Sequence, residues 1–195
     1  MTLRPDLRVI ADAVPPGARV LDVGCGDGAL MAALRDGKGV DARGIELSRE
    51  GVSAAVARGL SVVQGDADAD LVDYQTDAFD YAILSQTLQA TRAPHHVLDE
   101  LLRIGRHAIV SFPNFAYWRV RMSLMFGGRM PMTHALPVSW YETDNIHFCT
   151  IDDFRALIDG KRLTVERERF LTHGRPRSAA LANLLAEQAI FVLRR

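Results

Sequence analysis

The sequence lacks several features that mark particular classes of protein. Its 195 residues include only two cysteines, Cys25 and Cys149, which do not make a disulfide framework. No apolar run approaches the length of a membrane span, and residues 1–6 lack a signal-peptide core, so we expect a cytoplasmic protein without a membrane partner. The formal net charge is −1, which gives no bulk positive charge for nucleic-acid binding.

Metal ligands and repeats are also missing. No pair of His, Cys or acidic residues has the spacing of a metal site, so we predict no metal. No repeat or low-complexity tract divides the chain. Because 48% of the residues are hydrophobic, the length suffices for one ordinary domain with a substantial core, and we expect residues 1–195 to form it.

The most informative stretch is residues 20–30. Residues 20–23, in which three apolar side chains flank Asp22, predict a short buried strand, and three alternating glycines then turn the chain into a helix that begins near Ala29. Glycine permits so tight a turn and lets a ligand approach the main chain. The free N–H groups of the next helix carry partial positive charge, so the stretch predicts a small-molecule pocket at the carboxyl end of the first strand.

The identity of the ligand depends on the residues around these glycines. Gly24, Gly26 and Ala29 satisfy the dinucleotide pattern G-x-G-x-x-G/A, which is a weak signal, and an empty glycine turn is a further alternative. With Asp22 and Gly28 included, the stretch resembles the first motif of class I S-adenosylmethionine-dependent methyltransferases. This resemblance implies a Rossmann-like three-layer α/β/α sandwich, with a mostly parallel seven-stranded sheet and an antiparallel last strand. It implies S-adenosylmethionine or S-adenosylhomocysteine as the cofactor.

Two later strand ends support this interpretation. Residues 42–46 predict a second strand that ends on Glu46, where a carboxylate can accept hydrogen bonds from both ribose hydroxyls; the alternative is a solvated surface acid. A third strand over residues 60–64 leads into Asp66 and Ala67, which resemble the methyltransferase motif whose Asp reaches the adenine amine. Asp66 could instead cap the next helix.

The fourth predicted strand, residues 79–85, ends where the methyl group lies in the methyltransferase geometry. Many small-molecule methyltransferases carry a His nearby, whereas this chain has Gln86 and Gln89, whose amides can bind a ligand but cannot act as a base. The catalytic residues are therefore unknown, and methyl transfer stays an open question. The predicted cofactor site comprises Asp22, Gly24, Cys25, Gly26, Gly28, Glu46, Leu47, Asp66, Ala67, Ser85 and Gln86.

The fifth predicted strand, residues 107–112, is followed by an insertion at about 115–149. Residues 112–115 do not match the Asn/Asp-Pro-Pro-aromatic box of enzymes that methylate nucleic-acid bases. Within the insertion, four apolar residues fall on one helical face, and basic residues lie close by. This stripe either packs back over the cofactor or forms an exposed patch for a protein partner. Its members are Phe115, Trp118, Met122 and Met125, with Arg129 nearby.

Several segments together make the resemblance more specific. The chain resembles the methionine biosynthesis protein MetW family over nearly its whole length, in residues 19–28, 85–89, 109–115, 118–121, 127–131 and 145–151. The resemblance implies a protein that acts with a homoserine O-acyltransferase at the first committed step toward methionine, and we expect Trp118, Met122, Met125 and Arg129 to contact it. The alternative is a methyltransferase of an unidentified small-molecule acceptor. His134, Asn145 and His147 have no assigned role.

The remaining segments predict the edges of the domain. Residues 3–14 form one amphipathic helix with little chain before it, so a lid over the cofactor must come from elsewhere. Ser48 and Thr150 are predicted helix caps, the second with Asp153 in a capping box. Residues 163–171 and 189–193 predict the closing strands, with a polar turn at 173–178 and a helical linker at 179–187.

Overall fold

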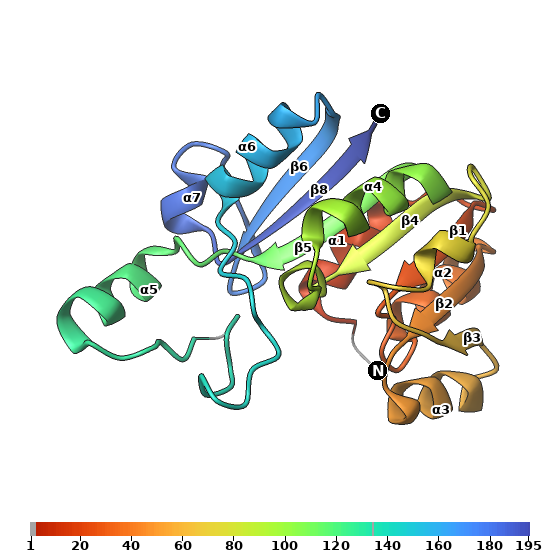
Figure 1. Cartoon of the computed structure of the whole chain (residues 1–195), viewed down its shortest axis with the longest axis horizontal. Coiled ribbons are helices and arrows are strands. Elements are labelled where there is room, and N and C mark those ends of the chain that lie inside the picture. The colour runs from red at the N-terminus through yellow and green to blue at the C-terminus, as the bar shows by residue number, and fades with distance from the viewer. Residues whose placement is uncertain (1–2, 134) are drawn as a thin grey trace.

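The computed structural model describes residues 3–133 and 135–195, and its centre is one eight-stranded sheet (Figure 1). The spatial order of the strands is β3-β2-β1-β4-β5-β8-β6-β7. The first five are mutually parallel, and β8 runs antiparallel to both of its neighbours. The strands are β1 (Arg19–Val23), β2 (Asp41–Glu46), β3 (Ser61–Gln64), β4 (Phe79–Ser85), β5 (Gly105–Pro113), β6 (Thr164–Thr172), β7 (Arg175–Arg177) and β8 (Gln188–Arg194).

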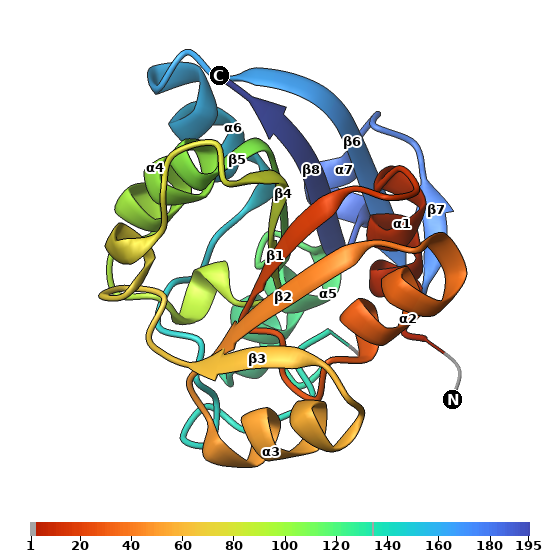
Figure 2. The same ribbon diagram turned by 90° about the vertical axis from the view of Figure 1, so that its right-hand side faces the viewer.

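Helices cover both faces of this sheet, which makes the three layers visible in Figure 2. On one face, α1 and α2 pack through Ile10 and Leu34 against β-strand residues such as Val20. On the other face, α4 and α6 pack around Phe112 and Phe154. The helices are α1 (Pro5–Ala13), α2 (Ala29–Lys38), α3 (Arg49–Ala57), α4 (Pro94–Ile104), α5 (Trp118–Met122), α6 (Ile151–Gly160) and α7 (Ala182–Leu185), with short turns η1 (Leu71–Asp73), η2 (Leu88–Ala90) and η3 (Ser123–Gly127).

Two of the helix boundaries are fixed by the caps that the sequence predicts. The Ser48 hydroxyl accepts a hydrogen bond from the Gly51 N–H at 3.1 Å at the start of α3. At the start of α6, the Thr150 hydroxyl and the Asp153 carboxylate form a reciprocal capping box. Each cap satisfies N–H groups that have no partner inside the helix. Both capping predictions are confirmed.

The expected Rossmann-like α/β sandwich with an antiparallel last strand is confirmed, but the expected count of seven strands is wrong. Residues 173–178, expected as a polar turn, contain the short strand β7, which pairs with the end of β6. The reason is the backbone at His173 and Gly174, with φ of 49° and 72°. Two successive left-handed residues match the twist of paired strands and close a tight hairpin, so the chain after them returns along β6.

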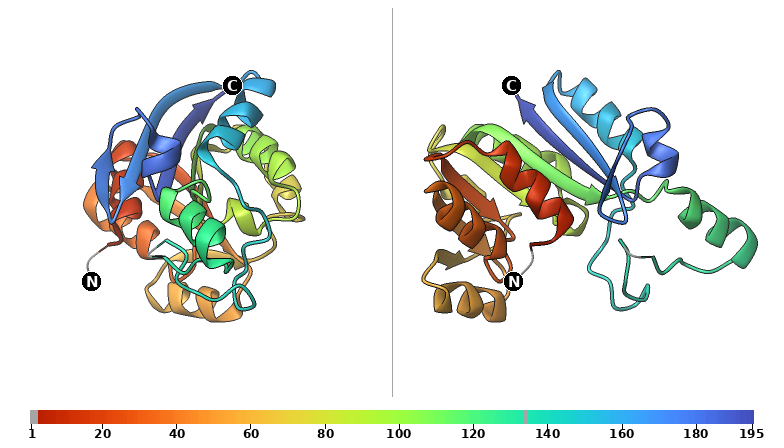
Figure 3. Two further views of the ribbon diagram at one scale, coloured as in Figure 1. Left: turned by 90° about the vertical axis from the view of Figure 1, so that its left-hand side faces the viewer. Right: turned by 180° about the vertical axis from the view of Figure 1, so that it is seen from behind.

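The insertion leaves the sheet after β5 and returns at α6. It projects past the carboxyl end of β5, with α5 far from the helical layers (Figures 1 and 3). Its buried face is formed by Tyr117 and Val120, which pack with Leu136. Among the described residues, none of the helices combines the length and the apolar character needed to cross a membrane.

Candidate cofactor site

The loop between β1 and α2 is shaped by its three glycines, and two of them make close contacts. All three have positive φ, between 55° and 74°. A Cβ on Gly24 would lie 2.6 Å from the Thr87 hydroxyl, and one on Gly28 would lie 2.3 Å from Leu60. By contrast, a Cβ on Gly26 would meet nothing within 4 Å. Gly24 and Gly28 therefore allow close packing, whereas Gly26 leaves its main chain open to a ligand.

Glu46 connects the second strand to this loop. One carboxylate oxygen accepts a hydrogen bond from the Gly26 N–H at 2.8 Å, and the other accepts from the Ser48 N–H at 2.9 Å. A carboxylate has about four lone-pair sites, so each oxygen can accept one more hydrogen bond. Glu46 is therefore not a freely solvated surface acid. Its carboxylate is held in place with acceptor capacity that a pair of hydroxyl donors could use.

Asp22 is a buried acid beneath the same loop. Its side chain is in β1 and is only 2% exposed, and none of the described residues donates a hydrogen bond to it. Burial and, to a lesser extent, the nearby charge of Glu46 together raise the pKa of Asp22 to about 7, and Arg4 partly opposes them. A buried carboxylate without a partner is costly to a fold, and this makes Asp22 a candidate for ligand contact.

The third strand end supplies Asp66 and Ala67 to a cleft that is also lined by Leu47, the residue after β2. One oxygen of Asp66 accepts a hydrogen bond from the Asp68 N–H at 2.9 Å, which closes a local turn. The alternative of a helix cap at Asp66 is wrong, because the next helical segment is the three-residue η1, whose N-cap is Asp70. Leu47 is 65% exposed, and it lines the same cleft of about 790 Å³ as Glu46 and Asp66.

At the end of β4, Gln86 lines this cleft and also a neighbouring hollow that contains Asp22, and Ser85 lines the neighbouring hollow. The Ser85 hydroxyl lies 3.3 Å from that of Ser111 on β5. The Gln86 N–H donates to the Ser111 carbonyl at 2.9 Å, which holds Gln86 in a left-handed conformation with φ of 55°. The amide nitrogen of Gln86 is buried and has no partner among the described residues. Gln86 therefore lines the cleft with an unused donor.

Neither cysteine is a candidate nucleophile. Cys25 is in the glycine loop and is 8% exposed, and burial raises the pKa of its thiol to about 12. Burial raises the pKa of Cys149 to about 12 as well. Both thiols are protonated at neutral pH. Among residues 3–133 and 135–195, we find no group of three His, Cys, Asp or Glu side chains that could hold a metal ion.

Several residues near the cleft were not in the predicted site. Thr87 touches Gly24, and Gln89 accepts hydrogen bonds at its carbonyl from the N–H groups of Ile146 and His147 at 2.9 and 3.0 Å. These contacts come from loops distant in sequence, so no local pattern predicts them. The N-terminal segment also reaches the site, since Leu3, Arg4 and Leu7 line a hollow that includes Asp22 and Gly24.

The insertion supplies another wall of the cleft, through Ala135, Pro137, Val138 and residues 142–146. The insertion thus lines the cleft, as expected for cover that comes from elsewhere than the N-terminus. The N-terminal residues Leu3, Arg4 and Leu7 line the neighbouring hollow instead. Of the three unassigned residues, Asn145 lines the cleft, and His147 is exposed and bonds through its main chain. His134 lies outside the described residues.

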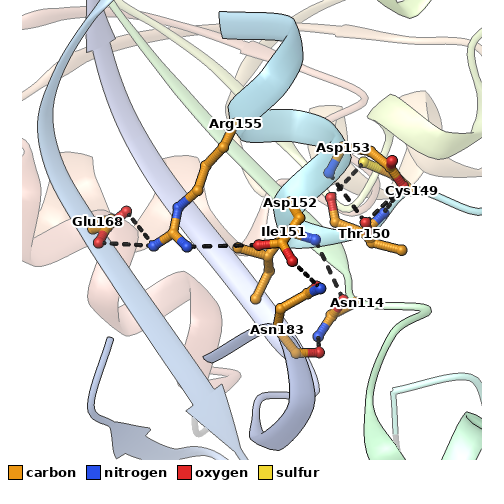
Figure 4. A network of polar contacts seen from close by, with 9 residues as sticks. All are labelled: Asn114, Cys149, Thr150, Ile151, Asp152, Asp153, Arg155, Glu168 and Asn183. Carbon is orange, nitrogen blue, oxygen red and sulfur yellow. Dashed lines mark hydrogen bonds and ion pairs between the residues drawn. The ribbon is translucent and has the colours of Figure 1, made fainter. Parts of the chain in front are cut away.

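The two ends of the insertion are fastened together by Asn114 (Figure 4). Its side chain is 2% exposed and accepts hydrogen bonds from the N–H groups of Ala116 and Ile151. Its amide nitrogen donates to the carbonyls of Asn183 and Ala186 at 2.9 and 2.8 Å. One buried amide thus joins the start of the insertion, the start of α6 and the segment around α7, and it fixes where the insertion leaves the sheet.

Comparison with known proteins identifies the family. A family model described as "Methionine biosynthesis protein MetW" matches residues 4–193. The chain belongs to the MetW family. The bifunctional methionine biosynthesis protein MetXA/MetW of Rhodopirellula baltica is 38% identical in an alignment of 179 residues that covers 87% of this chain. The match spans only 29% of that relative's length.

Solved structures share the fold of this MetW-family chain. An S-adenosylmethionine-dependent methyltransferase from Archaeoglobus fulgidus aligns over 97% of this chain and 91% of its own, with a TM-score of 0.72 and 12% identity. One from Mesorhizobium loti aligns over 98% of this chain and 96% of its own, with a TM-score of 0.70 and 18% identity. At these identities the likeness establishes the class I methyltransferase fold. The identity of the ligand has to be argued from the residues of the site.

Proposed function

We propose that this chain binds S-adenosylmethionine or S-adenosylhomocysteine and acts with a homoserine O-acyltransferase in methionine biosynthesis. The observation that carries the cofactor part is the direct link between two strand ends, in which the Glu46 carboxylate accepts from the Gly26 N–H. Asp66 lines the same cleft, whose volume of about 790 Å³ lies within the usual range for small-molecule sites. An adenosine with two ribose hydroxyls fits these acceptors.

Calorimetric titration of Glu46→Ala with both nucleotides tests the cofactor part. A hydrogen bond to a charged group contributes roughly 1.5–3 kcal/mol, so affinity should fall at least about tenfold. Glu50→Ala is the matched control, because Glu50 is a neighbouring exposed acid on α3 whose carboxylate accepts a hydrogen bond from the Ser48 hydroxyl. Unchanged affinity in Glu46→Ala would remove Glu46 from the site, and no binding by the unaltered chain would refute the cofactor proposal.

The partner part is supported by the exposed surface of the insertion. We call Trp118, Met122, Met125 and Arg129 the insertion patch. Trp118, Met122 and Met125 are 41%, 43% and 76% exposed, so the alternative in which this stripe packs back on the domain is wrong for these three residues. Phe115 does pack inward, with its ring 5.0 Å from that of Phe148. Exposed aromatic, Met and Arg side chains are enriched at protein interfaces.

The Rhodopirellula relative adds support, because its name joins MetXA and MetW in one chain and the MetW match covers only 29% of it. Two activities carried by one polypeptide in one organism are candidates for association as separate chains in another. The MetW resemblance implies a homoserine O-acyltransferase as that partner. The insertion patch is the surface of this chain that we assign to the contact.

Co-purification with the homoserine O-acyltransferase of the same genome tests the partner part. The doubly substituted Trp118→Glu, Met122→Glu chain should lose the complex and keep nucleotide binding, since the patch lies outside the cleft. Val56→Glu is the control, because Val56 is 53% exposed on α3. If the unaltered chains neither associate nor change the acyl-transfer rate, the partner proposal fails.

One observation favours a second candidate, methyl transfer to a small-molecule acceptor. The cleft extends past the predicted cofactor residues to Gln86, Gln89 and the insertion. In-line methyl transfer depends mainly on positioning, so the absence of a His among the described lining residues does not exclude it. Formation of S-adenosylhomocysteine on incubation with small-molecule extracts, above the rate without extract, tests this candidate.

A further inference from the structure

Gln89 presents a fixed hydrogen-bond acceptor that nothing in the described chain uses. The side chain is 4% exposed, and its amide nitrogen donates to the Gln86 carbonyl at 2.6 Å. Because only the nitrogen of the amide can donate to a carbonyl, this bond identifies the other terminal atom as the oxygen. That oxygen is buried and has no partner among the described residues. Leaving such a buried acceptor unpaired destabilises the fold, so it calls for a donor from outside the protein.

Gln86 presents the complementary donor beside it. Its amide nitrogen is also buried and also lacks a partner in the described part of the chain. Its main chain is held by Ser111 in a left-handed conformation, which is unusual for a residue other than glycine. Residues with a strained backbone conformation cluster at active sites and ligand-binding sites. One acceptor and one donor therefore lie at the same end of β4, and both residues line the cleft.

The charges around the cleft restrict what can bind there. Its described lining contains five carboxylate residues and no Lys, Arg or His. Two of the five, Glu142 and Asp144, belong to the insertion and are exposed, while the others are Glu46, Asp66 and Asp68. Such a surface attracts ammonium groups and repels phosphates and carboxylates. The insertion side of the cleft is therefore suited to a cation.

We infer that Gln86, Gln89 and the acidic insertion wall form a second small-molecule subsite for a primary amine that also carries a hydroxyl or carbonyl oxygen. The ammonium donates to the Gln89 amide oxygen and is attracted by Glu142 and Asp144. The neighbouring oxygen of the ligand accepts from the Gln86 amide nitrogen. This inference rests on the proposed function only in that the nucleotide is expected to fill the Glu46 side of the same cleft.

The test uses L-serinamide as the probe, because it carries an ammonium, a hydroxyl and a carboxamide. D-glycerate is the anionic comparison. Binding is followed by NMR chemical-shift changes in the full chain saturated with S-adenosylhomocysteine, whose own affinity is measured first by calorimetry. We expect saturable serinamide binding, no glycerate binding, and at least tenfold weaker serinamide binding in Gln89→Met, with each chain kept saturated with S-adenosylhomocysteine according to its own measured affinity.

Two further variants complete the experiment. Gln75→Met is the matched control, since Gln75 is an exposed amide far from this cleft. The double variant Glu142→Gln, Asp144→Asn changes only exposed side chains, so it tests the charge argument even if Gln89→Met does not fold. Serinamide binding should weaken in it severalfold.

The outcomes separate the subsite from the proposed function. No serinamide binding, or equal binding in Gln89→Met and the unaltered chain, would mean that water alone satisfies the two amides and that the inference is wrong. Equal binding of glycerate would overturn the assigned ligand class. If S-adenosylhomocysteine itself does not bind, the proposed function fails, and serinamide titration of the unliganded chain then tests the subsite separately.

Discussion

Replacing Asp22 by asparagine should stabilise this protein at neutral and alkaline pH. Asp22 is buried in β1, and burial, followed by the charge of Glu46, raises its pKa from 3.8 to about 7. Asparagine has nearly the same shape and carries no charge. The substitution therefore removes the cost of ionising a buried carboxylate and leaves the packing of the strand in place.

The sign and size of the effect follow from proton binding. The unfolded chain loses the Asp22 proton near pH 4, whereas the folded chain keeps it until about pH 7. Between these values the folded state binds more protons, so its free energy of unfolding falls as the pH rises and is constant above about pH 7. A shift of about three pKa units corresponds to about 4 kcal/mol. Asp22→Asn should be more stable by that order at pH 8 and equally stable at pH 4.

Urea denaturation of both chains at several pH values between 4 and 9, at constant ionic strength, measures this difference. Asp12→Asn is the control, because Asp12 is exposed on α1, and its substitution should change stability by less than about 0.5 kcal/mol. In a Glu46→Gln background the gain from Asp22→Asn should shrink, since the Glu46 charge contributes to the raised pKa.

Two results would refute this reasoning. If Asp22→Asn is no more stable than the unaltered chain at pH 8, the Asp22 carboxylate is compensated in the folded state. If the difference does not vary with pH, ionisation of Asp22 is not its cause. A stabilised Asp22→Asn chain with weakened nucleotide binding would instead show that the fold retains a costly charge for its ligand.

Four further substitutions test how the site is built, each by urea denaturation at pH 7. Gly28→Ala should destabilise by about 1–3 kcal/mol, because its φ is 74° and the new Cβ would meet Leu60, whereas Gly37→Ala in α2 meets nothing and should stabilise by roughly 0.5–1 kcal/mol. Thr150→Ala should cost about 1 kcal/mol by removing the capping box of α6. Asn114→Ala should cost about 3 kcal/mol, because several buried main-chain groups lose their partner, and it should speed proteolysis within the insertion.

Local sequence signals were sufficient for most of the Rossmann-like core. The predicted strand at 79–85 has the bounds of β4 (Phe79–Ser85), and the helix α4 (Pro94–Ile104) follows it. These segments have apolar periodicity, and Pro94 begins the helix where proline is favoured. The glycine loop was predictable for the same reason, since its turn and the following helix are encoded by consecutive residues.

The surroundings of the site depend on contacts that no local pattern contains. Periodicity placed Trp118 and Met122 on one face of a helix, but it could not tell whether that face meets the core. The opposite face, with Tyr117 and Val120, is the buried one, because the returning chain brings Leu136 against it. Likewise, the main-chain carbonyl of Gln89 accepts hydrogen bonds from Ile146 and His147 on a distant loop, and only the folded chain reveals that the side-chain oxygen of Gln89 has no partner among the described residues.

The insertion joins the two functional surfaces that we propose. Pro137, Val138, Thr143 and Asn145 line the nucleotide cleft and also an apolar pocket that includes Trp140 and Phe148. Their segment is tied to the end of β4 through the hydrogen bonds from Ile146 and His147 to Gln89. A ligand that shifts these four residues must therefore change the apolar pocket on the insertion. If the partner that contacts the insertion patch also reaches this pocket, linkage requires the partner to change nucleotide affinity by the same factor as the nucleotide changes partner affinity.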